Sequence, residues 1–149
     1  MEENLKQLLL KDLCARLPYG VKIKIRGGNI RTVRAVDAVE GIVHFVEPDT
    51  ISPFGIHIEG PMDFRQKVKP YLRPMSSMTE EEKNVFHRLV MKFNEYELFY
   101  YNLQNRNFYE YLFTYTSELL DWLHAHHFDY RGLIPMGLAL EAPEDMYNI

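Results

Sequence analysis

The sequence is poor in the residues that stabilise very small or fibrous proteins. Among its 149 residues there is a single cysteine, Cys14, so no disulfide can form within the chain. A disulfide-stabilised fold is therefore excluded, and a reducing compartment is favoured. Glycine and proline, eight of each, are too few for a collagen-like or low-complexity chain.

Long apolar runs are also absent from the sequence. No stretch approaches the roughly 20 apolar residues that cross a bilayer. The first residues, MEENLKQ, carry two acids where a secretory signal needs positive charge, and the apolar run at 8–10 is shorter than such a signal requires. We therefore expect a cytoplasmic protein that has no membrane partner.

Charge is distributed unevenly along a chain that is otherwise typical of a globular domain in composition and length. Residues 1–75 hold 12 Lys and Arg against 9 Asp and Glu, whereas residues 76–149 hold 5 against 12. The two halves could attract each other or bind different partners. We expect a helix plus a small β-sheet subdomain over residues 1–75, and a helical segment over residues 76–149 packed on it as one compact unit.

Hydrophobic spacing predicts a helix followed by a sheet in the first half. Apolar residues recur at helical spacing over residues 4–17, and Cys14 falls in this stripe as a small core residue. Alternation with a period of two then predicts strands, with Gly27 and Gly28 in a hairpin turn and a bulge near Val33. The predicted strands are 21–26, 30–36, 41–47, 56–59 and 67–72. The expected fold class is α+β, with a small antiparallel sheet or SH3-like barrel before the C-terminal helical segment.

A capping box marks the start of the helical half. Thr79 and Glu82 have the spacing at which a hydroxyl and a carboxylate cap each other's backbone amides, which predicts a helix from there to about Asn94. Further on, Asp129 is placed to cap a short turn.

Residues 93–115 are rich in aromatic side chains, with ten Phe or Tyr among 23 residues. Two interpretations stay open. In one, Asn107 caps a helix that follows it, and the inner face of this helix carries Phe108, Leu112, Tyr115, Leu119 and Trp122. In the other, 96–103 and 108–115 form an aromatic hairpin. A helix over 117–127 is common to both.

Three segments of the sequence carry a resemblance: LLLKDLCARLPYGVK at 8–22, VKPYLRPMSSMTEEE at 68–82 and DWLHAHHFDYRGLIPMGLALEAPEDMY at 121–147. Together they resemble a family of short uncharacterised proteins of Bacteroides-type bacteria and their phage or mobile elements. The resemblance implies a bacterial or phage setting. It implies no particular reaction and supplies no catalytic residues.

A histidine cluster near residue 125 has two interpretations. Asp121, His124 and His127 have helical spacing that could supply zinc ligands, as part of a metal-dependent enzyme. The simpler interpretation, which we favour, is that His126 and His127 lie in a last helical turn, where an imidazole meets the carbonyl end of the helix dipole. No phosphate loop, nucleophile elbow or paired CxxC motif occurs. We therefore expect no enzymatic activity, no catalytic residues and no cofactor.

Two surfaces are candidates for binding. The leading hypothesis is a non-enzymatic protein-interaction module that binds a protein partner or itself through aromatic residues. These residues are Tyr96, Phe99, Tyr100, Tyr101, Phe108 and Tyr109. The alternative is a nucleic-acid-binding module that uses a basic strand face, because residues 20–36 contain cations and no acid. The cations are Lys22, Lys24, Arg26, Arg31 and Arg34. A purely structural interpretation is that these lysines face solvent and prevent the strands from pairing with other strands at a sheet edge.

Overall fold

The computed structural model of the chain describes residues 2–46, 53–57, 68–102 and 108–147, and it describes only the backbone of residues 2–3, 46, 53–57, 93–102 and 108–115. The helices are α1 (Glu2–Arg16), α3 (Glu80–Asn102) and α4 (Phe108–Ala125), with short 3₁₀ turns η1 (Leu17–Tyr19) and η2 (Met75–Ser77). The strands are β1 (Lys22–Ile25), β2 (Ile30–Asp37), β3 (Ile42–Val46), β4 (Pro53–His57), β5 (Val68–Leu72) and β6 (Leu140–Glu141). The α+β prediction is confirmed.

The strands form one mixed sheet in the order β4-β3-β2-β1-β5-β6. Neighbouring strands are antiparallel except β5 and β6, which are parallel. The hairpin between β1 and β2 turns through Gly27 and Gly28, whose positive φ angles suit glycine, as predicted. The predicted bulge lies in β2 between Val33 and Ala35, where the pairing with β3 shifts register. The fourth strand begins earlier than predicted, at Pro53.

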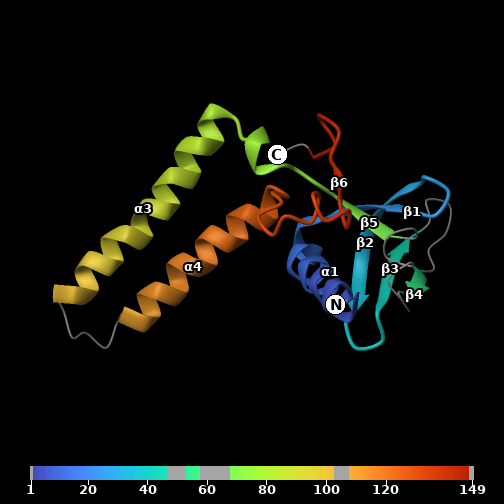
Figure 1. The fold of residues 1–149 in the computed structure, drawn as a ribbon, viewed down its shortest axis with the longest axis horizontal. Coiled ribbons are helices and arrows are strands. Elements are labelled where there is room, and N and C mark those ends of the chain that lie inside the picture. Colours follow the sequence, from blue (N-terminus) through green and yellow to red (C-terminus); the bar gives the residue numbers. More distant parts are fainter. Residues whose placement is uncertain (1, 47–52, 58–67, 103–107, 148–149) are drawn as a thin grey trace.

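One face of the sheet is covered by α1 (Figure 1). The buried residues of this core alternate along β1 and follow helical spacing along α1, with Leu9 and Leu13 packed against Ile23 and Leu72. The prediction that Cys14 is a core residue was wrong, because this side chain is exposed. It lies about 100° round the helix from Leu13, beyond the edge of the buried stripe.

The segment after α4 returns to the sheet and completes the core. Leu133 and Leu138 are fully buried in the same cluster as α1 and β1. The predicted cap is present, since both carboxylate oxygens of Asp129 accept hydrogen bonds from backbone amides, those of Leu133 at 2.8 Å and Ile134 at 2.9 Å. The C-terminal half of the sequence therefore contributes directly to the core under the sheet.

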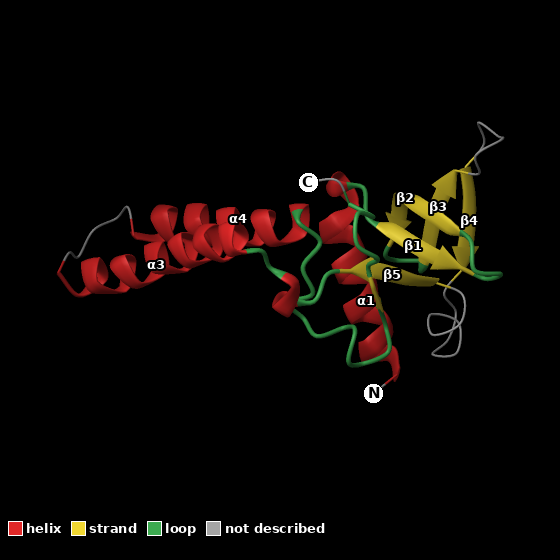
Figure 2. Cartoon of the chain, turned by 90° about the horizontal axis from the view of Figure 1, so that it is seen from above, coloured by secondary structure: helices red, strands yellow, loops and turns green. Residues whose placement is uncertain are grey.

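The two long helices α3 and α4 form an antiparallel pair that extends away from the body of the molecule (Figures 1 and 2). We call this pair the arm. The helical interpretation of the aromatic stretch is confirmed, and the hairpin interpretation is wrong, because α3 continues to Asn102 and α4 begins at Phe108. The proposed cap at Asn107 lies outside the described residues.

A buried ion pair joins α1 to the chain that follows the arm. Asp12 and Arg16 are both fully buried and lie 2.8 Å apart, one turn apart on α1. Arg16 Nη2 donates to the carbonyl of Phe128 at 2.6 Å, and Arg131 Nε donates to the other oxygen of Asp12 at 3.1 Å. Residues more than a hundred positions apart are thus held by one network, which we call the Asp12 network.

We expect Asp12→Ala to lower the free energy of unfolding by about 3–5 kcal/mol, because it leaves the Arg16 guanidinium buried without a counter-charge. Urea denaturation measures this change. The control is Lys11→Ala, an exposed neighbour on the same helix, which should change stability by no more than about 0.5 kcal/mol. A loss below about 1 kcal/mol for Asp12→Ala would contradict the importance of the network.

Candidate functional site

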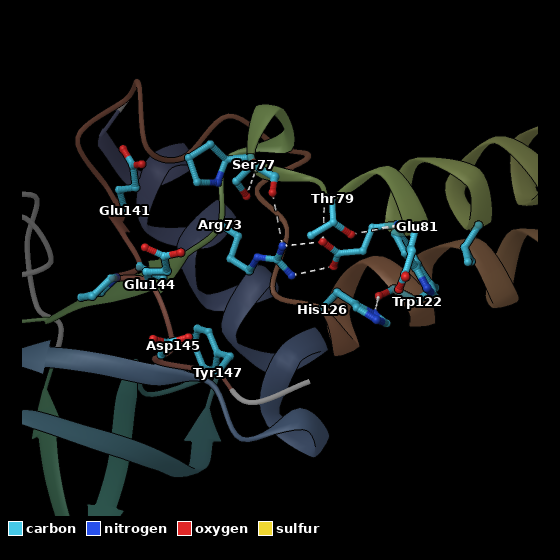
Figure 3. Close-up of a pocket in the computed structure, with 15 residues that line it drawn as sticks. Arg73, Ser77, Thr79, Glu81, Trp122, His126, Glu141, Glu144, Asp145 and Tyr147 are labelled. Atoms are coloured by element: carbon cyan, nitrogen blue, oxygen red, sulfur yellow. Dashed lines mark hydrogen bonds and ion pairs between the residues drawn. The ribbon is translucent and has the colours of Figure 1, made fainter.

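A cavity of about 740 Å³ lies where the arm meets the body (Figure 3). Four parts of the chain line it. They are the connection from β5 to α3, the first turns of α3, the last turns of α4 and the segment 141–147. The cavity therefore forms only when the C-terminal segment has returned past the base of the arm.

One wall of the cavity is an arginine held by the first turn of α3. Arg73 makes a two-pronged ion pair with Glu82, with both N–O distances 2.7 Å, and its guanidinium stacks over the Phe128 ring at 4.3 Å. Glu82 also completes the predicted capping box, because it accepts from the Thr79 amide at 3.0 Å while the Thr79 hydroxyl accepts from the Glu82 amide at 3.1 Å. The hydrogen bonds from Arg73 lower the pKa of Glu82 to about 2.

The rest of the polar lining is acidic. Glu81, Glu141, Glu144 and Asp145 also border the cavity, and no ion pair of theirs is present in the described part of the chain. Because Glu82 already neutralises Arg73, the lining carries a net negative charge. Its electrostatic field suits a cationic group better than an anion.

Aromatic rings form the wall contributed by α4. Trp122 stacks on His126 with ring centres 4.5 Å apart and on Phe128 at 5.6 Å. His126 Nδ1 lies 2.9 Å from the carbonyl of Trp122, so this nitrogen must carry the proton, because a carbonyl can only accept. An imidazole meets the carbonyl end of the helix at His126, as the simpler interpretation of the histidine cluster predicted. That interpretation was wrong for His127, which lies beyond the end of α4 and whose ring stacks on Tyr147.

The helix α4 ends at a histidine in a left-handed conformation. His127 has φ of 60°, its amide donates to His124, and the amide of Phe128 donates to Leu123, which is the Schellman pattern. The His127 ring is buried and stacks on Tyr147 at 3.6 Å between centres. Burial, and then the cation of Arg16, lower the pKa of His127 to about 4. The imidazole is therefore neutral at pH 7.

The three suggested metal ligands do not form a ligand set. His124 Nε2 lies 2.7 Å from the Tyr130 hydroxyl, His127 stacks on Tyr147, and Asp121 is exposed on the helix. Among the residues that the structure describes, no three His, Cys, Asp or Glu are arranged to hold a metal ion. The left-handed turn at His127 rotates this residue out of the helical spacing on which the metal hypothesis depended.

The five cations suggested for nucleic-acid binding do not share one face. Lys22 pairs with Thr32 and Lys24 with Ile30, so these lysines lie on the face opposite the core. Arg31 pairs with Ile23, which is buried, so Arg31 lies on the core side of β2. We missed Lys69, which lies directly opposite Lys24 on β5.

The remaining two cations are exposed. Arg26 follows β1 in the hairpin turn, and Arg34 lies at the bulge of β2. The sequence could not show that Lys69 lies opposite Lys24, because β5 is separated from β1 by more than forty residues.

The suggested protein-binding residues lie on the distal half of the arm. Tyr96, Phe99, Tyr100 and Tyr101 belong to α3, and Phe108 and Tyr109 begin α4. Their side chains lie outside the described part of the structure, so these residues stay a prediction.

Comparisons with models of protein families, with curated proteins and with solved structures found no match for this chain. The family resemblance inferred from the sequence is therefore untested and stays a prediction. No described helix is both long enough and apolar enough to cross a membrane.

Acid should weaken the contact between Arg73 and Glu82. The pKa of Glu82 is about 2 in the folded protein against an ordinary value of 4.5, so the pair contributes its full stability above pH 4.5 and loses it as the pH falls towards 2. We expect Glu82→Gln, which keeps the capping bond, to flatten the fall in unfolding free energy over this interval. Denaturant titrations at a series of pH values measure it. A wild-type slope retained in the variant would contradict the assignment.

His127 should cause a separate loss of stability as the pH falls, and this loss should begin at a higher pH than the one caused by Glu82. Its pKa is about 4 when folded and ordinarily 6.5, so the unfolded chain takes up this proton first as the pH falls from 6.5 to 4. Stability should fall by at most about 1.4 kcal/mol per pH unit in this window. We expect His127→Asn, which tolerates the left-handed backbone, to remove that slope. An unchanged slope would show that another group titrates.

Proposed function

We propose that this protein is a non-enzymatic interaction module that self-associates through the distal half of its arm. The observation that carries the proposal is the arm itself. Two helices leave the body together, both views show the described chain meeting them only at their base (Figures 1 and 2), and ten aromatic residues lie in 93–115 near their far end.

The inner side of the arm is defined by contacts near its base. The Phe86 and Trp122 rings stack with centres 6.1 Å apart, and Lys92 lies 3.4 Å from Glu118. Steps of seven residues, two helical turns, lead from Phe86 to positions 93 and 100, and from Trp122 to positions 115 and 108. A two-helix pair needs one apolar stripe on each helix, and these positions supply it.

Other aromatic residues exceed what this inner stripe requires. At 100° per residue, positions 109 and 113 lie about 100° or more from the inner stripe of α4. Tyr109 and Phe113 occupy these positions. Large rings on the outer sides of an isolated helix pair are stabilised only if something covers them.

A second copy of the arm is the simplest cover. Two helical hairpins that pair about a two-fold axis form a four-helix arrangement, in which each outer stripe meets its own equivalent. Tyr and Phe suit such an interface because they bury a large area at low entropic cost. The base of the arm is held by the Arg73–Glu82 ion pair, which supports presentation of the distal half in one orientation. A cytoplasmic setting, suggested by the composition, and a bacterial or phage setting, suggested by the resemblance of three segments, belong to the same proposal.

We expect the wild-type protein to be a dimer in light scattering at micromolar concentration. Tyr109→Gln with Phe113→Gln should weaken the dimer roughly 30-fold, the effect of losing about 2 kcal/mol at an interface hot spot. Sedimentation over a range of concentrations measures the change. Gln is a good helix former, so circular dichroism should be unchanged.

The matched control is Val39→Gln, which changes an apolar residue that is 93% exposed in the turn after β2. It should leave the dimer intact. A wild-type monomer at all concentrations would reject self-association, and an equal weakening by Val39→Gln would reject the arm as the interface.

A further inference from the structure

We infer that the open face of β1 and β5 is a second, separate binding surface, and that it takes the phosphate backbone of nucleic acid. The surface consists of Lys22, Lys24, Arg26 and Lys69, which we call the basic face. It lies on the sheet of the body and not on the arm (Figure 2), so it goes beyond self-association and does not depend on it.

Strand register brings these cations together. Lys24 and Lys69 are directly opposite each other on adjacent antiparallel strands, and Lys22 lies two residues before Lys24 on the same face. The Lys22 ammonium also contacts the Thr32 hydroxyl across β2 at 3.1 Å, which confirms its side of the sheet. Residues two apart on a strand are about 6.7 Å apart, so the charges form a short row.

Protection of a sheet edge does not explain Lys22 and Lys24. That function applies to edge strands, but β1 lies between β2 and β5. It remains open for Lys69, because β6 pairs with β5 only at Tyr71 and Leu72. Like charges directly opposite each other destabilise a sheet. No ion pair of Lys24, Arg26 or Lys69 is present among the residues that the structure describes. Within the described part of the chain no ion pair offsets this repulsion, which a bound polyanion would relieve.

The basic face is also hollowed. A cavity of about 390 Å³ is lined by Lys24, Arg26 and Lys69, with the backbone turn at Gly27 and Gly28 on its rim. The lining side chains are cationic or apolar. An anionic group that enters the cavity therefore meets cations from both strands and from the hairpin turn.

The net negative charge of the whole chain does not oppose this assignment. Glu81, Glu144 and Asp145 border the other cavity, at the base of the arm, and exposed charges are screened beyond about 8 Å at physiological salt. Glu141 is nearer, because it follows Leu140, which lines the cavity of the basic face. The aromatic residue on this face, Tyr71, is half-buried, so stacking on bases adds little. Phosphate contacts then dominate, and binding should not depend on sequence.

The test is fluorescence anisotropy of a labelled duplex DNA of about 20 base pairs with the full chain, from about 50 mM salt upwards. Four cations predict a slope of log affinity against log salt of about −3.6. Lys24→Gln with Lys69→Gln should make the slope shallower by about 2. Circular dichroism confirms that the variant is folded.

Two control variants remove one cation each from elsewhere. Arg31→Gln removes a cation from the core side of the same hairpin, and Lys11→Gln removes an exposed cation from α1. Both should leave the slope unchanged. Inorganic tripolyphosphate should compete with the duplex at the same lysines. The inference is overturned if the duplex does not bind at about 50 mM salt, if tripolyphosphate binds and the duplex does not, or if the controls weaken binding as much as the double variant.

Discussion

The arrangement of the whole molecule depends on one buried charge, the Arg16 guanidinium. A buried cation is costly unless it is paired, and here Asp12 pairs it from one turn earlier on α1 while the Phe128 carbonyl accepts a further hydrogen bond. This hydrogen bond requires the chain after the arm to bring Phe128 next to α1. The Asp12 network therefore specifies where the arm ends, whatever net stability it adds.

Phe128 also connects the Asp12 network to the arm. The Phe128 ring lies under Arg73, which pairs with Glu82 in the first turn of α3. The backbones of residues 73 and 128 also form a parallel bridge, so the two strands of chain that connect body and arm are tied together. Consecutive contacts thus link helix α1 to the end of α4 and to the start of α3. These contacts fix the base of the arm to the body.

The parts of this structure that could be predicted from the sequence are those set by nearby residues. The glycines of the first hairpin and the Thr79–Glu82 capping box act over a few positions and were found. The contact of Arg16 with Phe128 was not, because spacing along the chain contains no information about which distant segments meet. The contact of Glu82 with Arg73 spans only nine residues, but it depends on the turn η2 between them, which was not predicted. Arg31 was placed on the wrong face for a related reason. The bulge in β2 disturbs the alternation, so faces could be assigned only from the pairing with β1.

His127 shows why the cavity at the base of the arm is formed before any ligand arrives. A left-handed residue at the end of a helix is usually glycine, and a side chain there costs about 1 kcal/mol. The cost is offset because the turn places the imidazole flat against Tyr147, whose hydroxyl donates to the Tyr71 carbonyl at 2.8 Å and accepts from the Lys22 amide at 2.9 Å. The end of α4, the C-terminal segment and the sheet are therefore fixed together, and the walls of the cavity do not need to be assembled by binding.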